Sequence, residues 1–272
     1  TWRHQCHTEA FGSNGEGSDA SLTSWFAPGT LSQLRYLWLL IERQADLPLR
    51  RILATFFSDV LFACASPGKA LTSTGRRRRH HWGWVADNVH PKKRVEHDAI
   101  GLFETRLAAL PECMPSADTA DVLIIQQDAR CIALPSNCVD LVVTSPPYIS
   151  VIDYTRANRL VYAWMGWPLA RERERGIGAR FKRWRLGAVG EYLDDMRACW
   201  REIHRVLRPN GYCAVVIGES RRYLGTVAET LRDLTESMPQ IWGPVARDPS
   251  RRRVSDRGAN EPVEYLCVFQ KV

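Results

Sequence analysis

The stretch VDLVVTSPPYIS, residues 139–150, joins an apolar run to a loop whose residue types could bind an aromatic amine. Pro146 and Pro147 each fix φ at about −65° and lack an N–H group, so the loop is stiff and backbone acceptors dominate it. Ser145 adds a side-chain oxygen, and Tyr148 adds a flat face on which a ring can stack. Such a loop suits a substrate that presents donors, for example an exocyclic amine.

The elements around this loop predict an α/β open sheet. The runs DVLIIQ (121–126) and VDLVVT (139–144) are continuous and apolar, as expected for strands buried on both faces. Sites in open α/β sheets form at the carboxyl ends of strands, and the Ser145 loop follows such an end. The further elements expected are a helix over 190–207, a strand over 212–218 after the turn RPNG, a helix over about 226–237 and a strand over 263–269.

Helical periodicity predicts which side of several helices is buried. The helix over 190–207 would bury Leu193, Met196, Trp200, Ile203 and Leu207. Before residue 120, Thr30 could cap a helix that buries Leu31, Leu34, Leu37, Trp38 and Ile41. A second helix after Pro48 would use Leu49, Ile52, Leu53, Phe56, Val60 and Leu61. Residues 66–98 have no period and predict a long exposed loop.

Charge and composition favour a polyanionic partner. The 272 residues carry a net charge of +7, concentrated in basic blocks at 75–84, 91–97, 171–185 and 250–257. Arginine interleaved with tryptophan suits a phosphate backbone and stacked bases, although each block alone could be a solvated surface loop. No apolar stretch is long enough to cross a bilayer and no signal peptide opens the chain, so we expect a cytoplasmic protein.

Cysteine and histidine usage gives no sign of a metal. The eight cysteines are scattered without a CxxC pair, which is typical of reduced core thiols. HQCH (4–7) lacks a second pair of ligands, so we expect no metal site.

The run QQDARCIALPSNCVDLVVTSPPYISVIDYTRANRL (126–160) resembles the S-adenosylmethionine-dependent DNA amino-methyltransferases, whose motif IV is TSPPY-like. HRVLRPNGYCAVVIGES (204–220) and EYLCVFQK (264–271) resemble later blocks of that family. The resemblance implies a partial Rossmann-like class I methyltransferase sheet over 121–272, preceded by a helical target-recognition segment over 1–120.

The resemblance also implies roles for single residues. Ser145 and the carbonyl of Pro146 would accept hydrogen bonds from the amine of a flipped base, with Pro147 stiffening the loop and Tyr148 stacking on the base. S-adenosylmethionine would contact Asp128, Ala129 and Thr144; alternatively, Asp128 is a turn or capping residue. Double-stranded DNA would contact the basic loop through Arg76, Arg77, Arg78, Arg79, Trp82, Lys92 and Lys93.

The family's Gly-rich cofactor loop has no convincing counterpart. AFGSNGEGSDAS (10–21) follows residues too polar for the buried strand that such a loop requires, so Gly12, Gly15 and Gly17 predict a flexible loop instead. Two strands of the family's sheet are then missing between DVLIIQ and VDLVVT, so we expect VDLVVT to have an unpaired edge and DVLIIQ to have no neighbour. We therefore expect the chain to be the carboxyl-terminal part of a longer protein and to bind the cofactor poorly as it stands.

Several functions remain open at this point. A serine in SPP followed by an aromatic residue is more typical of cytosine-N4 enzymes, whereas DPPY or NPPY is more typical of adenine-N6 enzymes. An RNA or protein methyltransferase that shares the motif is another alternative. A catalytically inactive DNA-binding relative is a different class of function. The sequence does not choose between a restriction–modification and an epigenetic role.

Overall fold

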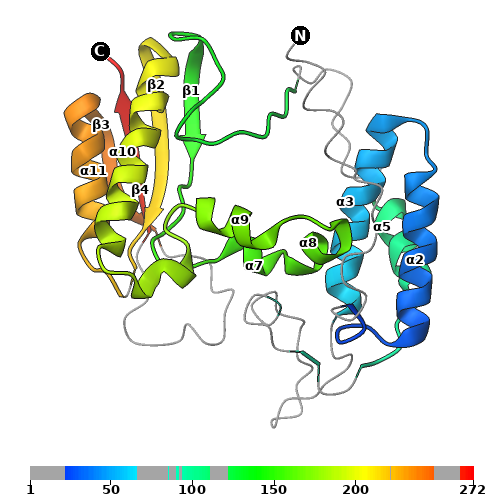
Figure 1. The fold of residues 1–272 in the computed structure, drawn as a ribbon. Coiled ribbons are helices and arrows are strands. Elements are labelled where there is room, and N and C mark those ends of the chain that lie inside the picture. Colours follow the sequence, from blue (N-terminus) through cyan, green and yellow to red (C-terminus); the bar gives the residue numbers. More distant parts are fainter. Residues whose placement is uncertain are drawn as a thin grey trace. The chain divides into compact units, whose positions relative to one another are not determined.

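The computed structural model describes residues 22–65, 85, 90–91, 94–110, 122–220, 222–247 and 264–272. These residues fall into two compact units (Figure 1). The helical unit contains the described parts of 1–121 and 154–174, and the sheet unit contains those of 122–153 and 175–272. Within the described ranges, no helix combines the length and apolar character needed to cross a bilayer.

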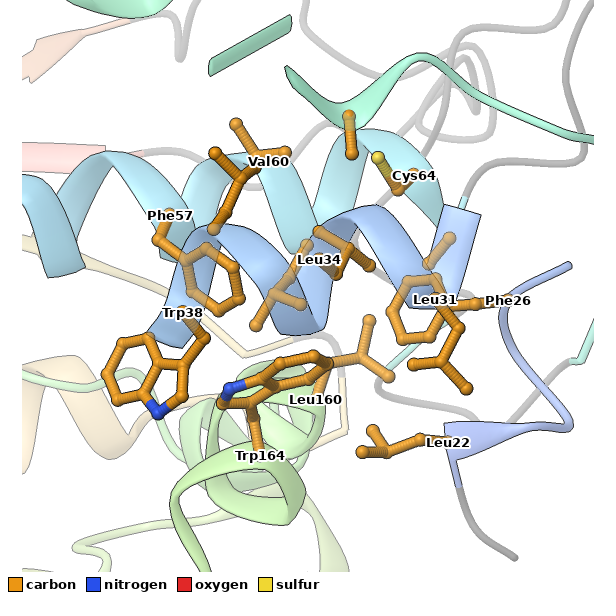
Figure 2. Close-up of a cluster of buried hydrophobic side chains, with 14 of the residues drawn as sticks. Leu22, Phe26, Leu31, Leu34, Trp38, Phe57, Val60, Cys64, Leu160 and Trp164 are labelled. Carbon is orange, nitrogen blue, oxygen red and sulfur yellow. The ribbon is translucent and has the colours of Figure 1, made fainter. Parts of the chain in front are cut away.

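The helical unit is built on amphipathic helices that share one core. Its helices are α2 (Pro28–Glu42), α3 (Leu47–Cys64), α5 (Ala99–Ala108), α7 (Tyr154–Ala157) and α8 (Arg159–Met165), and α9 (Leu169–Arg175) follows them in the chain. Phe57 of α3 lies at the centre, with its ring 5.1 Å from the rings of both Trp38 and Trp164 (Figure 2). The segment that follows the SPPY loop in sequence therefore supplies part of this core through α8.

Both helices predicted before residue 66 are present, with corrections to their details. The expected face of α2 is buried, but Thr30 is not its cap: the helix begins at Pro28, whose fixed φ suits a first turn. In α3 the buried side of the helix differs from the predicted one. Phe57 is fully buried while Phe56 is half-buried, and Leu49 and Ile52 are exposed.

A carboxylate from a distant part of the sequence caps α2. Glu96 accepts hydrogen bonds from the N–H groups of Gly29 (3.1 Å) and Thr30 (2.7 Å), and from the Thr30 hydroxyl. These bonds, led by the one from Gly29, lower the pKa of Glu96. The residue thus satisfies helix donors that a local N-cap side chain would otherwise meet.

The sheet unit is a mixed α/β structure, which confirms the predicted fold class of an open sheet. Four strands lie in the order β1-β2-β4-β3, where β1 and β2 are parallel and the other pairs are antiparallel. The strands are β1 (Val139–Thr144), β2 (Leu207–Gly218), β3 (Gln240–Arg247) and β4 (Glu264–Gln270). The helices α10 (Ala188–Val206) and α11 (Thr226–Ser237) lie side by side on this sheet (Figure 1).

One face of the sheet forms the core of this unit. Cys213 and Val215 of β2 and Phe269 of β4 point into a cluster with the apolar sides of α10 and α11. The four residues expected on the buried side of α10 that belong to it are all buried, which confirms that face, and the fifth, Leu207, is buried as the first residue of β2. The core thiols are also confirmed in part: Cys64, Cys199, Cys213 and Cys267 are buried and free, while Cys131 is exposed.

The prediction of two strands buried on both faces is wrong, whereas the expected unpaired edge of VDLVVT and the lack of a neighbour for DVLIIQ are confirmed among the described residues. The segment 122–127 is described but is not a strand, and Ile124 is 91% exposed. A strand requires a neighbour for its N–H and C=O groups, and no described segment pairs with this one. β1 does form, but it lies at the edge of the sheet, so Leu141 and Val143 are exposed.

The RPNG segment belongs to β2 rather than preceding it as a turn. Between Val139 and Leu141 of β1, the partner in β2 advances from Leu207 to Tyr212, so the intervening residues form a bulge. Asn210 adopts a φ of 66° there, which Asn tolerates better than most residues. β3 and α5 were not foreseen from the sequence.

The position of Phe57 generates a stability prediction for the helical unit. Phe57→Ala should lower its free energy of unfolding by about 3–5 kcal/mol, because a fully buried aromatic ring leaves a cavity. Urea titration followed by tryptophan fluorescence would detect the change, since Trp38 and Trp164 contact this ring. The neighbouring variant Phe56→Ala is the control and should cost less than half as much. Equal losses would contradict the observed helix face.

Candidate active site

The SPPY loop begins where β1 must end. Pro146 and Pro147 cannot donate to a strand ladder, so the hydrogen-bonded register with β2 stops at Thr144. Because β1 and β2 are parallel, Ser145 and Gly218 leave the sheet at the same edge. β4 begins with Glu264 at this edge, opposite Gly218.

Tyr148 is fixed at both ends of its side chain. Its ring lies directly over Gly218: a Cβ atom there would be 2.5 Å from the ring, so only glycine allows this contact. The Tyr148 hydroxyl donates to Glu264 Oε1 at 3.1 Å and lies 3.4 Å from Ser145 Oγ. The other oxygen of Glu264 accepts from Arg247 Nε at 2.8 Å. The ring is therefore held in one orientation beside Ser145.

The phenol of Tyr148 is neutral at ordinary pH. Burial is the main cause that raises its pKa, and the charge of Glu264 raises it further, while the hydrogen bond with Ser145 opposes the rise. A neutral phenol can donate its hydrogen bond to Glu264, and it places no negative charge next to Ser145. The loop therefore presents neutral oxygen acceptors.

The two proline carbonyls of the loop have different partners. The hydroxyl of Tyr192, a buried residue of α10, donates to the Pro147 carbonyl at 3.1 Å. Burial raises the pKa of Tyr192 to about 12, so this donor also stays protonated. Among the described residues, none donates a hydrogen bond to the Pro146 carbonyl. Ser145 Oγ and the Pro146 carbonyl are thus the acceptors that the loop leaves for another molecule.

Asp128 is held in a turn by an arginine. Its Oδ1 accepts from the backbone N and from Nε of Arg130, both at 3.0 Å, and its Oδ2 accepts from NH2 at 2.8 Å. The hydrogen bond from Arg130 is the main reason that the pKa of Asp128 is lowered. Arg130 also reaches Asp195 of α10 at 2.7 Å. Arg175 lies at 4.0 Å from Oδ2 of Asp128 as well. Asp128 therefore has the role of a turn residue, and the hydrogen bonds from Arg130 leave about one of the four acceptor sites of its carboxylate.

The other expected cofactor contacts lie near these groups in the chain. Ala129 is exposed in the same turn, and Thr144 is the last residue of β1, paired with Val215. The described residues contain no glycine-rich turn between a strand and a helix that could hold the methionine part of the cofactor. Contact of Asp128, Ala129 and Thr144 with S-adenosylmethionine stays a prediction.

Several predicted sites lie outside the described residues. These are the DNA-contacting residues Arg76, Arg77, Arg78, Arg79, Trp82, Lys92 and Lys93, the glycines Gly12, Gly15 and Gly17, and HQCH (4–7). Where the structure does describe the chain, no three His, Cys, Asp or Glu side chains gather in a way that could bind a metal.

Three residues of the site were missed by the sequence reasoning. In the sequence, Glu264 is the polar first residue of an apolar run and Gly218 is the last residue of another. Tyr192 is one of several apolar residues in a predicted helix. Gly218 could have been found as the carboxyl end of a predicted strand, where sites form, whereas Glu264 reaches this edge only through the antiparallel pairing of β4 with β2.

Comparison with known proteins finds a limited likeness in fold. No family model matches the chain, and no curated protein is similar to it. Three solved structures of a candidate DNA modification methylase from Thermus thermophilus match with a TM-score of 0.30 and between 21% and 23% identity. The match covers 53% of this chain and 50–52% of theirs, so this chain spans about half their length. One of the three is complexed with S-adenosyl-L-methionine.

The contact between Tyr148 and Glu264 predicts a pH response. Glu264→Gln should lower the pKa of Tyr148, because the carboxylate disfavours the phenolate and the amide does not. Carbon-13 NMR of ring-labelled tyrosine across alkaline pH would measure it, with Tyr148→Phe to assign the signal. Glu236→Gln, an exposed position on α11, is the control. An unchanged pKa in Glu264→Gln would contradict the contact.

Proposed function

We propose that the chain belongs to an S-adenosylmethionine-dependent DNA methyltransferase that methylates the exocyclic amine of a flipped base, with cytosine N4 as the preferred target. The observation that carries this proposal is the pair of oxygen acceptors, Ser145 Oγ and the Pro146 carbonyl, on a stiff loop at the carboxyl edge of the sheet. Tyr148 lies beside them in a fixed orientation.

The acceptors can make an aromatic amine nucleophilic. An amine that donates one N–H to Ser145 Oγ and the other to the Pro146 carbonyl loses part of its conjugation with the ring. Its lone pair is then available to form a bond to the methyl carbon, while the carbon–sulfur bond breaks and its electron pair stays on sulfur. Bound S-adenosylmethionine supplies this electrophilic methyl group. The amine then loses one proton to solvent, and no metal is required.

The other candidate site residues have roles that fit the same proposed reaction. Tyr148 would stack on the base from the position that Gly218 and Glu264 give it. Asp128 would use its remaining acceptor site for the adenine amine of the cofactor, with Ala129 and Thr144 nearby. Arg76, Arg77, Arg78, Arg79, Trp82, Lys92 and Lys93 would bind double-stranded DNA. The protein would act in the cytoplasm, in a restriction–modification or epigenetic role.

A second function is supported by two observations. The carboxylate of Asp128 is largely occupied by Arg130, and the described residues hold no glycine-rich loop. Both facts fit a relative that binds DNA without methylating it. The decisive experiment therefore measures binding as well as transfer.

The test uses the protein in its natural full-length form. It would be incubated with tritiated S-adenosylmethionine and unmethylated bacterial DNA, and the nucleosides would be separated after digestion. Label in N4-methylcytosine supports the cytosine assignment, and label in N6-methyladenine keeps the mechanism but changes the base. DNA binding without any label favours the inactive relative.

Ser145→Ala should lower the rate of methyl transfer by roughly 100-fold or more, since one group that acts on the reacting amine is lost. The measurement is the single-turnover rate with saturating DNA and cofactor. Ser237→Ala, in which a serine that bonds only to the backbone of α11 is removed, is the matched control and should keep the full rate. Full activity in Ser145→Ala would remove the serine from the mechanism.

A further inference from the structure

We propose that Arg183, Trp184 and Arg222, here named the Arg–Trp patch, bind the phosphates of the DNA strand next to the candidate active site. This inference rests on the proposed function and adds a DNA contact to it. Arg183 and Trp184 end the 3-10 helix η1 (Arg180–Trp184), and Arg222 follows β2.

The cations of this region divide into two groups. Lys182 is buried and paired with Glu191 of α10, and Arg185 lies 3.6 Å from the other oxygen of Glu191. Both cations are thus paired with the same carboxylate, that of Glu191. Arg183 and Arg222, by contrast, have no carboxylate partner among the described residues, so their charge remains available to an external anion.

Stacking fixes the position of these two arginines without neutralising them. The Arg222 guanidinium lies 4.2 Å from the centre of the Trp184 ring, and that of Arg183 lies 5.0 Å from it. Both distances are within the range of a cation–π contact. A stacked guanidinium uses its flat face and keeps its N–H donors at the edge, where a phosphate can bind two of them. In Arg222, Nε donates to the Tyr223 hydroxyl at 3.4 Å, so the two terminal nitrogens are the donors left for a phosphate.

The patch is attached to the SPPY loop by short links. The N–H of Ser150 donates to the Gly178 carbonyl at 2.8 Å, and the N–H of Arg180 donates to the Ile152 carbonyl at 3.2 Å. The Tyr223 hydroxyl donates to the carbonyl of Arg183 at 2.6 Å, which joins the segment after β2 to η1. A strand whose base reaches Ser145 would therefore pass near these arginines.

The ring of Trp184 remains accessible to an external group. It is 70% exposed although two guanidinium groups stack on it. Tryptophan beside arginine that lacks a carboxylate suits phosphates with a base or sugar against the ring. An acidic protein surface is the competing partner, and the experiment includes it.

The experiment measures DNA affinity as a function of salt with the natural full-length protein. Fluorescence anisotropy with a short labelled unmethylated duplex, between about 50 and 200 mM salt, gives the slope of log K against log [salt]. Arg183→Ala and Arg222→Ala should each make the slope shallower by about 1, and the double variant by about 2. Trp184→Ala should weaken binding with little change in slope, because it removes the positioning of Arg222 but no charge.

The matched control removes the same charge elsewhere. Arg232→Ala lies on an exposed position of α11 and should leave both affinity and slope unchanged. The proposal is overturned if the patch variants and Arg232→Ala behave alike. It is also overturned if DNA binding is unchanged while binding to a polyglutamate probe falls, since the patch would then serve an acidic protein.

Failure of the patch and failure of the proposed function give different results. In one case the wild-type protein transfers no methyl group, but the double variant still has a shallower salt dependence of DNA binding. This result would support the DNA contact and contradict the proposed enzyme activity. In the other case methyl transfer is normal at saturating DNA, but the patch variants have the same salt dependence as Arg232→Ala. This result would support the proposed enzyme activity and contradict the role of the Arg–Trp patch.

Discussion

The parallel pairing of β1 with β2 places the SPPY loop next to Gly218, and the geometry of the site depends on it. Two prolines end β1, so the chain leaves the sheet at Ser145 with acceptors and almost no donors. The bare backbone at Gly218 leaves room for the ring of Tyr148, and Glu264 at the start of β4 holds its hydroxyl. A change in this register would move the whole loop, and with it Tyr148, away from Gly218 and Glu264.

The same pairing leaves β1 at an edge of the sheet. Parallel strands are normally covered on both faces and paired on both sides, and the mostly apolar composition of VDLVVT fits such a strand. In the described residues it is paired on one side only, and Leu141 and Val143 are exposed. The segment 122–127 shows the same conflict more strongly, since it has the composition of a buried strand and no partner among the described residues. Apolar composition specifies a strand only where a neighbour supplies the hydrogen bonds.

This distinction explains how far the sequence could predict the structure. The local signals were sufficient for α10, α11 and β1, because helical periodicity and a run that ends in two prolines are properties of the segment itself. They failed for 122–127, for the face of α3 and for the bulge at Asn210, because each depends on what packs or pairs alongside. Ser145 and Pro146 could be found from their type, whereas Glu264 joins the site only through the antiparallel pairing of β4 with β2.

The position of Asp128 illustrates how one residue can serve both structure and function. Arg130 takes three hydrogen-bonding positions of its carboxylate and links it to Asp195, so the turn is anchored to α10. A carboxylate without such support would be free to rotate, and its one remaining acceptor site would have no fixed direction. The hydrogen bonds from Arg130 therefore leave Asp128 able to accept from only one further donor, and they fix the position of that donor. An adenine amine presents such a donor, which is compatible with the cofactor contact that we propose for Asp128.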